Sequence, residues 1–254
     1  MKKVRHTHFS RTYCARSEDR KLRSSMEKKK FAVFDVDGTI FRSSLLIQVV
    51  NRLIENDVFP ASARKVYERD YERWLNREGD YDAYIGAVVQ AFVKHLKGVH
   101  YSALADAAEE IVEEQWKHVY RYTRDLIKDL EKRGYFILAV SHSPKTVLDK
   151  FTPRLGFNKT YGMLYEIGPQ DCFTGKVIEE HLILNKASIL RRAIEKENLT
   201  LAHSIGVGDT ESDISFLELV AKPICFNPNL KLYTYAKRMK WDVVVERKDV
   251  VYKL

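Results

Sequence analysis

The sequence predicts an α/β fold, namely a Rossmann-like parallel sheet with helices on both faces and an inserted α-helical cap domain. Three observations predict it. Short continuous apolar runs recur along the chain, and such runs are typical of strands that are buried on both faces of a parallel sheet. Stretches with helical periodicity separate most of these runs, which implies right-handed crossovers. A purely helical block interrupts the alternation after the first run, so we expect an insertion there.

The first strand is predicted at Phe31–Asp35 (FAVFD), and Gly38 permits a sharp turn after it. A helix follows, because apolar residues of 46–54 fall on one helical face before Pro60. Residues 60–120 contain only helical stripes and therefore predict the inserted block.

The second half of the chain alternates helices and strands. A helix is expected to end at Gly134, where a left-handed cap is natural. The elements expected after it are a strand at 135–140, a helix from near Pro144, a β-hairpin at 159–180 with turn signals at Gly168-Pro169 and Thr174-Gly175, a helix from Lys186, and strands at 203–209, 223–227 and 242–246.

The predicted domains are a basic tail (1–29), a catalytic core (30–44 and 121–254) and a helical cap (45–120). Residues 1–30 hold 11 Lys/Arg and 3 Asp/Glu, so they carry the whole net charge of +8. The rest of the chain is neutral and offers no overall basic excess for nucleic acid. We expect a disordered tail. Either it contacts RNA or anionic lipid, or translation starts at Met26 and residues 1–25 are an annotation artefact.

Several other classes of protein are disfavoured by composition. No apolar stretch approaches the roughly 18 residues of a membrane span, and the tail has no apolar core for a signal peptide. Cys14, Cys172 and Cys225 show neither disulfide nor metal spacing, which indicates a reducing compartment and predicts a cytoplasmic protein. No feature of the sequence indicates an oligomeric state.

Polar side chains follow three predicted strands at the points where the strands end. They are Asp35 and Asp37, Ser141 and Ser143, and Asp209 and Asp213. Ligands bind at this edge of an open parallel sheet, so we expect the six side chains to converge. Clustered carboxylates repel one another unless a cation lies between them, and a site with few oxygen ligands suits Mg²⁺.

Four motifs carry a resemblance to a known family. DVDGT (35–39), VSHS (140–143), Lys186 and GDTESD (208–213) resemble, in order and spacing, the motifs of the haloacid dehalogenase superfamily of phosphotransferases. A helical cap between the first two motifs is similar to the branch that includes phosphoserine phosphatase. The resemblance implies a Mg²⁺-dependent phosphatase that hydrolyses a small-molecule phosphate ester through an aspartyl-phosphate.

The resemblance also implies residue roles. Asp35 would be the nucleophile, and Asp37 would protonate the leaving oxygen and then activate water. Because dehalogenases of the superfamily lack this second aspartate, its presence favours phosphoryl transfer. The residues implied to contact or support the phosphoryl group are Thr39, Ser141, His142 through its backbone N–H, and Lys186.

The implied magnesium ligands are Asp35, Asp209 and a backbone carbonyl near Asp37, and Asp213 would ligate the metal or orient its water shell. A structural interpretation stays open for Asp213, because an acidic residue at the start of a helix is favoured by the helix dipole.

The sequence departs from the phosphoserine phosphatase pattern after the first motif. Those enzymes carry an acidic residue there that reads the substrate's amino group, whereas this chain has IFRSSLL (40–46) without a carboxylate. Phosphoserine is therefore disfavoured as the substrate. Five aromatic side chains in the helical block either pack helices together or face a cleft, where they would suit a nucleoside, aromatic or lipid-like phosphate. They are Tyr67, Tyr71, Trp74, Tyr81 and Tyr84.

Two alternative functions remain at the level of sequence. The same residues would pass the phosphoryl group to an alcohol instead of water. A non-catalytic binding protein that uses its basic tail would need none of the aspartates.

Overall fold

The structure is a computed structural model that describes residues 27–178 and 185–254. The predictions for residues 1–26, which include the basic tail, lie outside the described residues. So do the last two residues of the predicted hairpin.

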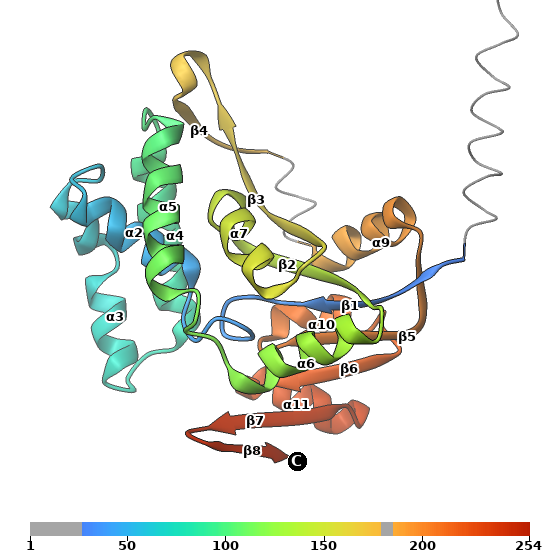
Figure 1. Ribbon diagram of the computed structural model, residues 1–254. Coiled ribbons are helices and arrows are strands. Elements are labelled where there is room, and N and C mark those ends of the chain that lie inside the picture. Colours follow the sequence, from blue (N-terminus) through green and yellow to red (C-terminus); the bar gives the residue numbers. More distant parts are fainter. Residues whose placement is uncertain (1–26, 179–184) are drawn as a thin grey trace, which may run out of the picture.

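An eight-stranded sheet forms the centre of the described molecule, with the order β4-β3-β2-β1-β5-β6-β7-β8 (Figure 1). The six central strands are parallel, and β4 and β8 are antiparallel edge strands. The strands are β1 (Lys29–Phe34), β2 (Phe136–Pro144), β3 (Lys159–Ile167), β4 (Phe173–Ile178), β5 (Leu199–Gly208), β6 (Lys222–Phe226), β7 (Asp242–Arg247) and β8 (Val250–Lys253).

The helices cover both faces of the sheet and also form a separate group beside it. The α-helices are α2 (Leu45–Glu55), α3 (Glu68–Leu75), α4 (Tyr81–Leu96), α5 (Tyr101–Gln115), α6 (Arg121–Lys132), α7 (Lys145–Phe151), α9 (Lys186–Glu197), α10 (Ile214–Leu217) and α11 (Leu230–Met239). The 3-10 helices are η1 (Ala61–Val66), η2 (Thr152–Leu155), η3 (Pro169–Asp171) and η4 (Glu211–Asp213). Among the described helices, none combines the length and the apolar character that crossing a bilayer requires.

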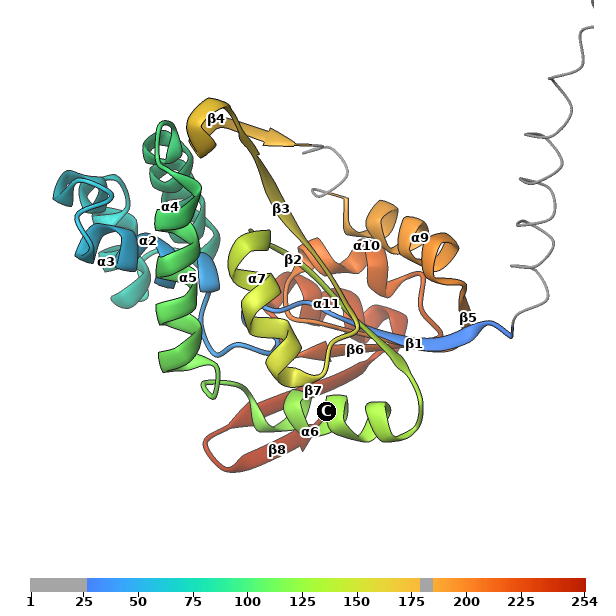
Figure 2. The same ribbon diagram turned by 45° about the horizontal axis from the view of Figure 1, so that its top comes forward.

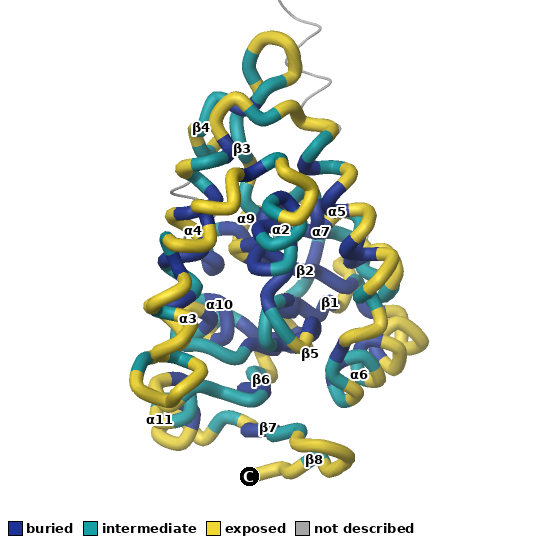
Figure 3. Tube along the Cα trace, turned by 90° about the vertical axis from the view of Figure 1, so that its left-hand side faces the viewer, coloured by how far each residue is buried: buried dark blue, intermediate teal, exposed yellow. Residues whose placement is uncertain are grey.

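Strand β1 explains why the apolar runs are continuous rather than alternating. Ala32 and Phe34 join one apolar cluster with α6, α7 and α2–α5, whereas Phe31 and Val33 join a second cluster with α9, α10 and α11. Successive side chains of a strand point to opposite faces, so a strand that is covered on both faces must be apolar at every position. Figure 3 shows β1 and β2 buried at the centre of the molecule.

The predicted Rossmann-like sheet with helices on both faces is confirmed, and four details differ. The sheet is mixed, because β4 and β8 run antiparallel and β8 lies in no predicted strand. Strand β2 extends to Pro144, so that helix α7 begins one residue later. Gly168 and Pro169 do lie at the hairpin turn, but Thr174-Gly175 lies inside β4.

Helices α2–α5 stand together at one end of the sheet, on the side away from α9 (Figures 1 and 2). The two chain segments that lead into and out of this group run side by side. The Arg42 N–H donates to the His118 carbonyl at 3.0 Å, and the Tyr120 N–H donates to the Ile40 carbonyl at 2.9 Å. The chain therefore enters and leaves the group through one paired connection. The group also contacts the core elsewhere, for example where the Gly98 N–H donates to the Phe173 carbonyl of β4 at 2.8 Å.

Candidate active site

The candidate site lies where the direction of strand succession reverses. From β1 the chain proceeds outward through β2 and β3, and it then returns to place β5, β6 and β7 on the other side of β1. The carboxyl ends of strands on either side of such a point leave a crevice in which ligands bind. Asp35 and Asp209 directly follow β1 and β5, as predicted, whereas Ser141 and Ser143 lie inside β2, because this strand continues to Pro144, which still pairs with Met163 of β3.

Asp35 is 5% exposed and is fixed at both its backbone and its side chain. Its N–H donates to the Val207 carbonyl at 2.9 Å, and the Lys186 ammonium donates to its Oδ1 at 2.6 Å. Burial raises the pKa of Asp35 to about 7, even though the ammonium of Lys186 lowers it.

Lys186 is buried between two carboxylates at the first residue of α9. Its ammonium lies 2.6 Å from Asp35 Oδ1 and 2.6 Å from Asp213 Oδ1. The helix starts here because the Asn185 side chain accepts from the Ser188 N–H as an N-cap. Burial alone would lower the pKa of Lys186, but the two carboxylates outweigh it and raise the pKa above its usual value.

Asp37 is held by three donors. The Leu45 N–H, at the first residue of α2, donates to its Oδ1 at 2.6 Å. The Ser141 and Ser143 hydroxyls both donate to its Oδ2 at 2.8 Å. Burial raises the pKa of Asp37, and these three hydrogen bonds offset only part of that increase.

Asp209 lies against the turn that follows β1. The Thr39 hydroxyl donates to Asp209 Oδ1 at 3.1 Å. A Cβ at Gly38 would lie only 2.1 Å from Asp209 Oδ2, and Gly38 has a φ of +81°. Glycine is therefore needed here both for the left-handed backbone and for the close approach of the carboxylate. Burial, followed by the negative charge of Asp35, raises the pKa of Asp209.

Asp213 is fully buried, and both of its oxygens are engaged by protein donors. Lys186 donates to Oδ1, and the backbone N–H groups of Asp209 and Thr210 donate to Oδ2 at 2.9 and 3.1 Å. Gly208 permits this approach, because a Cβ there would lie 2.5 Å from Asp213 Oδ2. In this geometry Asp213 orients Lys186 and the loop after β5.

The donor set fits a divalent cation. Oxygens of Asp35, Asp209 and Asp213 lie within 4.8 Å of one another. Together with Asp37 these are four carboxylates around one ammonium, so a bound cation would balance part of the buried negative charge. Since Lys186 and Thr39 occupy the Oδ1 atoms of Asp35 and Asp209, their Oδ2 atoms are the ones available for a metal.

The remaining predicted residue, His142, is exposed and lies beside the same pocket. Sequence reasoning missed two roles that the structure places at the site. Ser143 holds Asp37 together with Ser141, a role for which the repeated serine of VSHS was the available signal. Tyr81, from the start of α4, lies next to the aspartates, and no local motif indicates this position.

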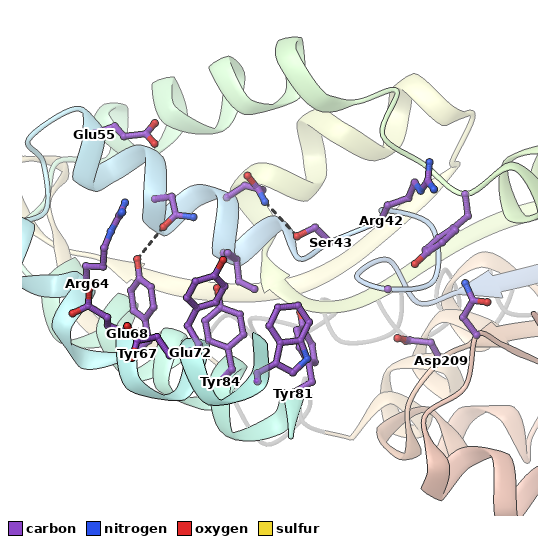
Figure 4. Close-up of a pocket in the computed structure, with 18 residues that line it drawn as sticks. Arg42, Ser43, Glu55, Arg64, Tyr67, Glu68, Glu72, Tyr81, Tyr84 and Asp209 are labelled. Carbon is purple, nitrogen blue, oxygen red and sulfur yellow. Dashed lines mark hydrogen bonds between the residues drawn. The ribbon is translucent and has the colours of Figure 1, made fainter. Parts of the chain in front are cut away.

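Two cavities meet at this site, and we name them the phosphoryl pocket and the elongated cavity. The phosphoryl pocket has a volume of about 330 Å³, and Asp35, Asp37 and Lys186 are among its lining residues. The elongated cavity has a volume of about 700 Å³ and runs from Asp209 along α2 and α3 (Figure 4). All five aromatic residues singled out from the sequence line it. They are Tyr67, Tyr71, Trp74, Tyr81 and Tyr84. Tyr67 and Tyr84 are only 4% and 5% exposed and also pack in the apolar core, so both interpretations of these aromatic residues apply.

Comparison with known proteins assigns the family. The family model described as haloacid dehalogenase-like hydrolase matches residues 32–218, which contain the four motifs and every side chain of the site described above. The chain is a haloacid dehalogenase-like hydrolase.

Relatives of this haloacid dehalogenase-like hydrolase include named phosphatases. A phosphoserine phosphatase from Methanocaldococcus jannaschii is 26% identical over 88% of this chain and 95% of the relative. A histidinol-phosphatase from Neisseria meningitidis serogroup C is 24% identical over 85% of this chain and 98% of the relative. The predicted superfamily, its phosphoserine-phosphatase-like branch and the class of phosphatase are confirmed.

Solved structures agree on the fold of this haloacid dehalogenase-like hydrolase. A structure titled as a phospho-aspartyl intermediate analogue of phosphoserine phosphatase superposes with a TM-score of 0.58. It is 22% identical and covers 88% of this chain and 96% of that chain.

Proposed function

We propose that the protein is a Mg²⁺-dependent phosphatase that hydrolyses a small-molecule phosphomonoester through an aspartyl-phosphate on Asp35. One observation carries the proposal: Asp35 is held beside Lys186 and within 4.8 Å of the Asp209 carboxylate, at the base of a pocket. Phosphoryl transfer depends chiefly on positioning and on stabilising charge, and this arrangement supports both. Mg²⁺, when bound by Asp35, Asp209 and the backbone near Asp37, would neutralise charge on the phosphoryl oxygens.

In the first step, an oxygen of Asp35 attacks phosphorus and the ester oxygen leaves. Lys186 keeps the carboxylate of Asp35 in one orientation and contributes positive charge. Asp37 gives its proton to the leaving oxygen, and the raised pKa of Asp37 favours the protonated form that this requires.

In the second step, Asp37 takes a proton from water, which attacks phosphorus and releases Asp35. The Ser141 and Ser143 hydroxyls, which donate to Asp37 in this structure, can rotate to donate to phosphoryl oxygens when Asp37 is protonated. The His142 N–H would donate to the same oxygens.

We also infer that residues 45–120 act as a cap over this site. Tyr81, Ile85 and Val89 of α4 line the phosphoryl pocket together with the aspartates, which supports this role. An exposed ion pair between Asp82 and Lys231, at 3.7 Å, joins the cap to the core. Closing such a cap would exclude water from Asp35 until the leaving group departs.

The segment after the first motif bears on the class of substrate. The names of the relatives point to small phosphomonoesters, but the segment after the first motif has no carboxylate for the amino group of phosphoserine. We therefore propose a different phosphomonoester from phosphoserine.

Turnover of p-nitrophenyl phosphate by the purified protein tests the reaction. We expect turnover with Mg²⁺, none with EDTA, and a loss of at least about 10³-fold in Asp35→Asn, whose side chain is nearly isosteric but is not a carboxylate nucleophile. Wild-type turnover in Asp35→Asn would refute the assignment of the nucleophile. Product analysis with added ethanol distinguishes hydrolysis from transfer, because transfer would yield ethyl phosphate.

A further inference from the structure

The elongated cavity is far larger than a three-carbon leaving group requires. Its volume of about 700 Å³ lies within the range of pockets that enclose drug-sized ligands. Ile47, Asn51 and Glu55 line it from successive turns of α2, so this wall alone is about 12 Å long at 1.5 Å per residue. Figure 4 shows Asp209 at one end and Glu55, Arg64 and Glu68 at the other.

The elongated cavity opens from the phosphoryl pocket at Tyr81. Tyr81 and Asp209 line both cavities. Burial raises the pKa of Tyr81 above its usual value, and the negative charges of Asp37 and Asp209 raise it further, which is consistent with a phenol next to the aspartates. A leaving group attached to a phosphoryl group at Asp35 would therefore extend past Tyr81 along the elongated cavity.

The middle of the elongated cavity is an aromatic wall made of Tyr71, Trp74, Tyr81 and Tyr84. The Trp74 and Tyr84 rings are stacked, with centroids 5.6 Å apart and planes at 20°. The Tyr81 and Trp74 rings meet edge-on with their centroids 5.6 Å apart, and the Tyr71 and Tyr84 ring centroids are 5.2 Å apart. Within this wall Tyr84 is buried, whereas Tyr71 and Tyr81 are exposed and Trp74 is half-buried, so these three rings offer surface that attracts a flat ring or a cation.

The far end of the elongated cavity carries an excess of negative charge. Glu55, Glu68 and Glu72 line it, with Arg64 as the single basic side chain there. Glu55 is paired with Arg52 at 3.1 Å. Neither Glu68 nor Glu72 forms an ion pair with any described basic residue. Two carboxylates at this end are therefore available for a positively charged group.

We propose that the leaving group of the substrate is an elongated aromatic alcohol that carries an ammonium group. The ring lies against the aromatic wall, and the ammonium meets Glu68 and Glu72 at the far end of the elongated cavity. The inference rests on the proposed function, because it takes the phosphoryl group to be held at Asp35. The same charge balance disfavours a leaving group that ends in a carboxylate, because the carboxylates at this end outnumber Arg64.

A matched series of aryl phosphates tests this inference. The para substituent is an ω-aminoalkyl chain of two, four or six carbons, compared with an alkyl chain and an ω-carboxyalkyl chain of the same length. The phenol that leaves is nearly the same throughout, so differences in kcat/KM report binding of the tail. We expect the best amine to exceed its alkyl counterpart by up to about fivefold, as for an exposed ion pair, and the carboxylate to be the poorest.

Two variants identify the residues responsible. In the double variant Glu68→Gln/Glu72→Gln the ratio of kcat/KM between amine and alkyl esters should fall to about one. Because the ratio is the readout, a general loss of activity cancels. The control is Glu78→Gln, which removes an exposed carboxylate just beyond α3 that does not line the cavity and should leave the ratio unchanged. Trp74→Leu should raise KM for every aryl ester of the series, by up to about tenfold.

The outcomes separate this inference from the proposed function. The ammonium site is overturned if amine and alkyl esters have the same kcat/KM in the wild-type protein, or if the amine keeps its advantage in Glu68→Gln/Glu72→Gln. In either case, Asp35-dependent turnover of p-nitrophenyl phosphate would still uphold the phosphatase. An unchanged KM in Trp74→Leu overturns the aromatic part. Absence of Mg²⁺-dependent turnover with every ester overturns both.

Discussion

Replacing Lys186 with methionine should damage stability as well as activity. The side chains of Lys186, Asp35 and Asp213 are 3%, 7% and 0% exposed, and both ammonium–carboxylate distances are 2.6 Å. Removing the ammonium leaves two buried carboxylates without their shared partner. Loss of one member of a buried pair costs about 3–5 kcal/mol. At about 2–4 °C per kcal/mol for a chain of this size, Tm should fall by about 6–20 °C.

The assay is urea unfolding in EDTA, since a bound cation would compensate for the lost ammonium. The pKa of Lys186 is raised in the folded state, so its contribution to stability is complete below its unfolded pKa and is lost only as pH rises through the higher folded value. Because the pKa of Asp35 is about 7, measurements at pH 8 keep both Asp35 and Lys186 charged in the wild-type protein and capture the larger effect. Lys196→Met is the matched control, because Lys196 is exposed on the same helix, and it should lie within about 0.5 kcal/mol of wild type.

A double variant makes the reasoning refutable. Lys186→Met/Asp213→Asn removes one of the uncompensated charges, so its cost should be smaller than the sum of the two single variants by about 1–3 kcal/mol. Phosphatase activity should not return, because Asp35 still lacks its ammonium partner. Costs that add without coupling, or a Lys186→Met protein within about 1 kcal/mol of wild type, would refute the account of this buried cluster.

Three further predictions follow from the geometry of the site and the core. Gly38→Ala should lower the free energy of unfolding by about 1–3 kcal/mol and reduce turnover more than 100-fold, because the new Cβ would displace Asp209. The control is Gly86→Ala on α4, where nothing lies within 4 Å of the new Cβ, and it should be neutral or stabilising. Equal effects of the two substitutions in urea unfolding and in turnover would contradict this. Mg²⁺ at 100 times its Kd should stabilise the protein by about 2.7 kcal/mol and raise Tm by about 5–10 °C, and the shift should vanish in Asp209→Asn; a persisting shift would place the ion elsewhere. Burial raises the pKa of Cys225 to about 12, which leaves little reactive thiolate at pH 8. In the native protein, iodoacetamide at pH 8 should therefore alkylate the partly exposed Cys172 before Cys225. Mass spectrometry that showed the reverse order would disprove the burial argument.

The sequence was most informative where local chemistry decides structure. A strand covered on both faces must be apolar throughout, so FAVFD identified β1 without any neighbour. The edge strand β8 and the extension of β2 to Pro144 depend on pairing with distant segments, which no local pattern contains. Thr174-Gly175 has the composition of a turn, and in the structure these residues lie where the register of β3 and β4 shifts, with Gly175 at a φ of +88°, inside a strand that pairs with β3 on either side.

The site also combines features that local sequence predicts with features that depend on tertiary structure. Asp35, Asp37 and Asp209 were found from the sequence because strands of a parallel sheet end at one common edge, so residues that follow those strands must meet. Lys186, at the start of a helix, was found only through the resemblance of the four motifs to the haloacid dehalogenase superfamily. Which atom contacts which was decided only by the tertiary structure. It directs Ser141 and Ser143 to Asp37 and gives both oxygens of Asp213 to protein donors.

The substrate-binding region depends still more on tertiary structure. The aspartates of the proposed reaction centre were predictable from residue types and spacing, because parallel strands end at one edge and phosphoryl transfer uses carboxylates there. Whether Trp74 and Tyr84 only pack helices together or also line a cavity depends on how α2, α3 and α4 cross. The sequence does not distinguish the two cases, because aromatic residues on one face of a helix have the same spacing in both. Only the folded chain brings this aromatic wall and the carboxylates of Glu68 and Glu72 into one cavity with Asp209.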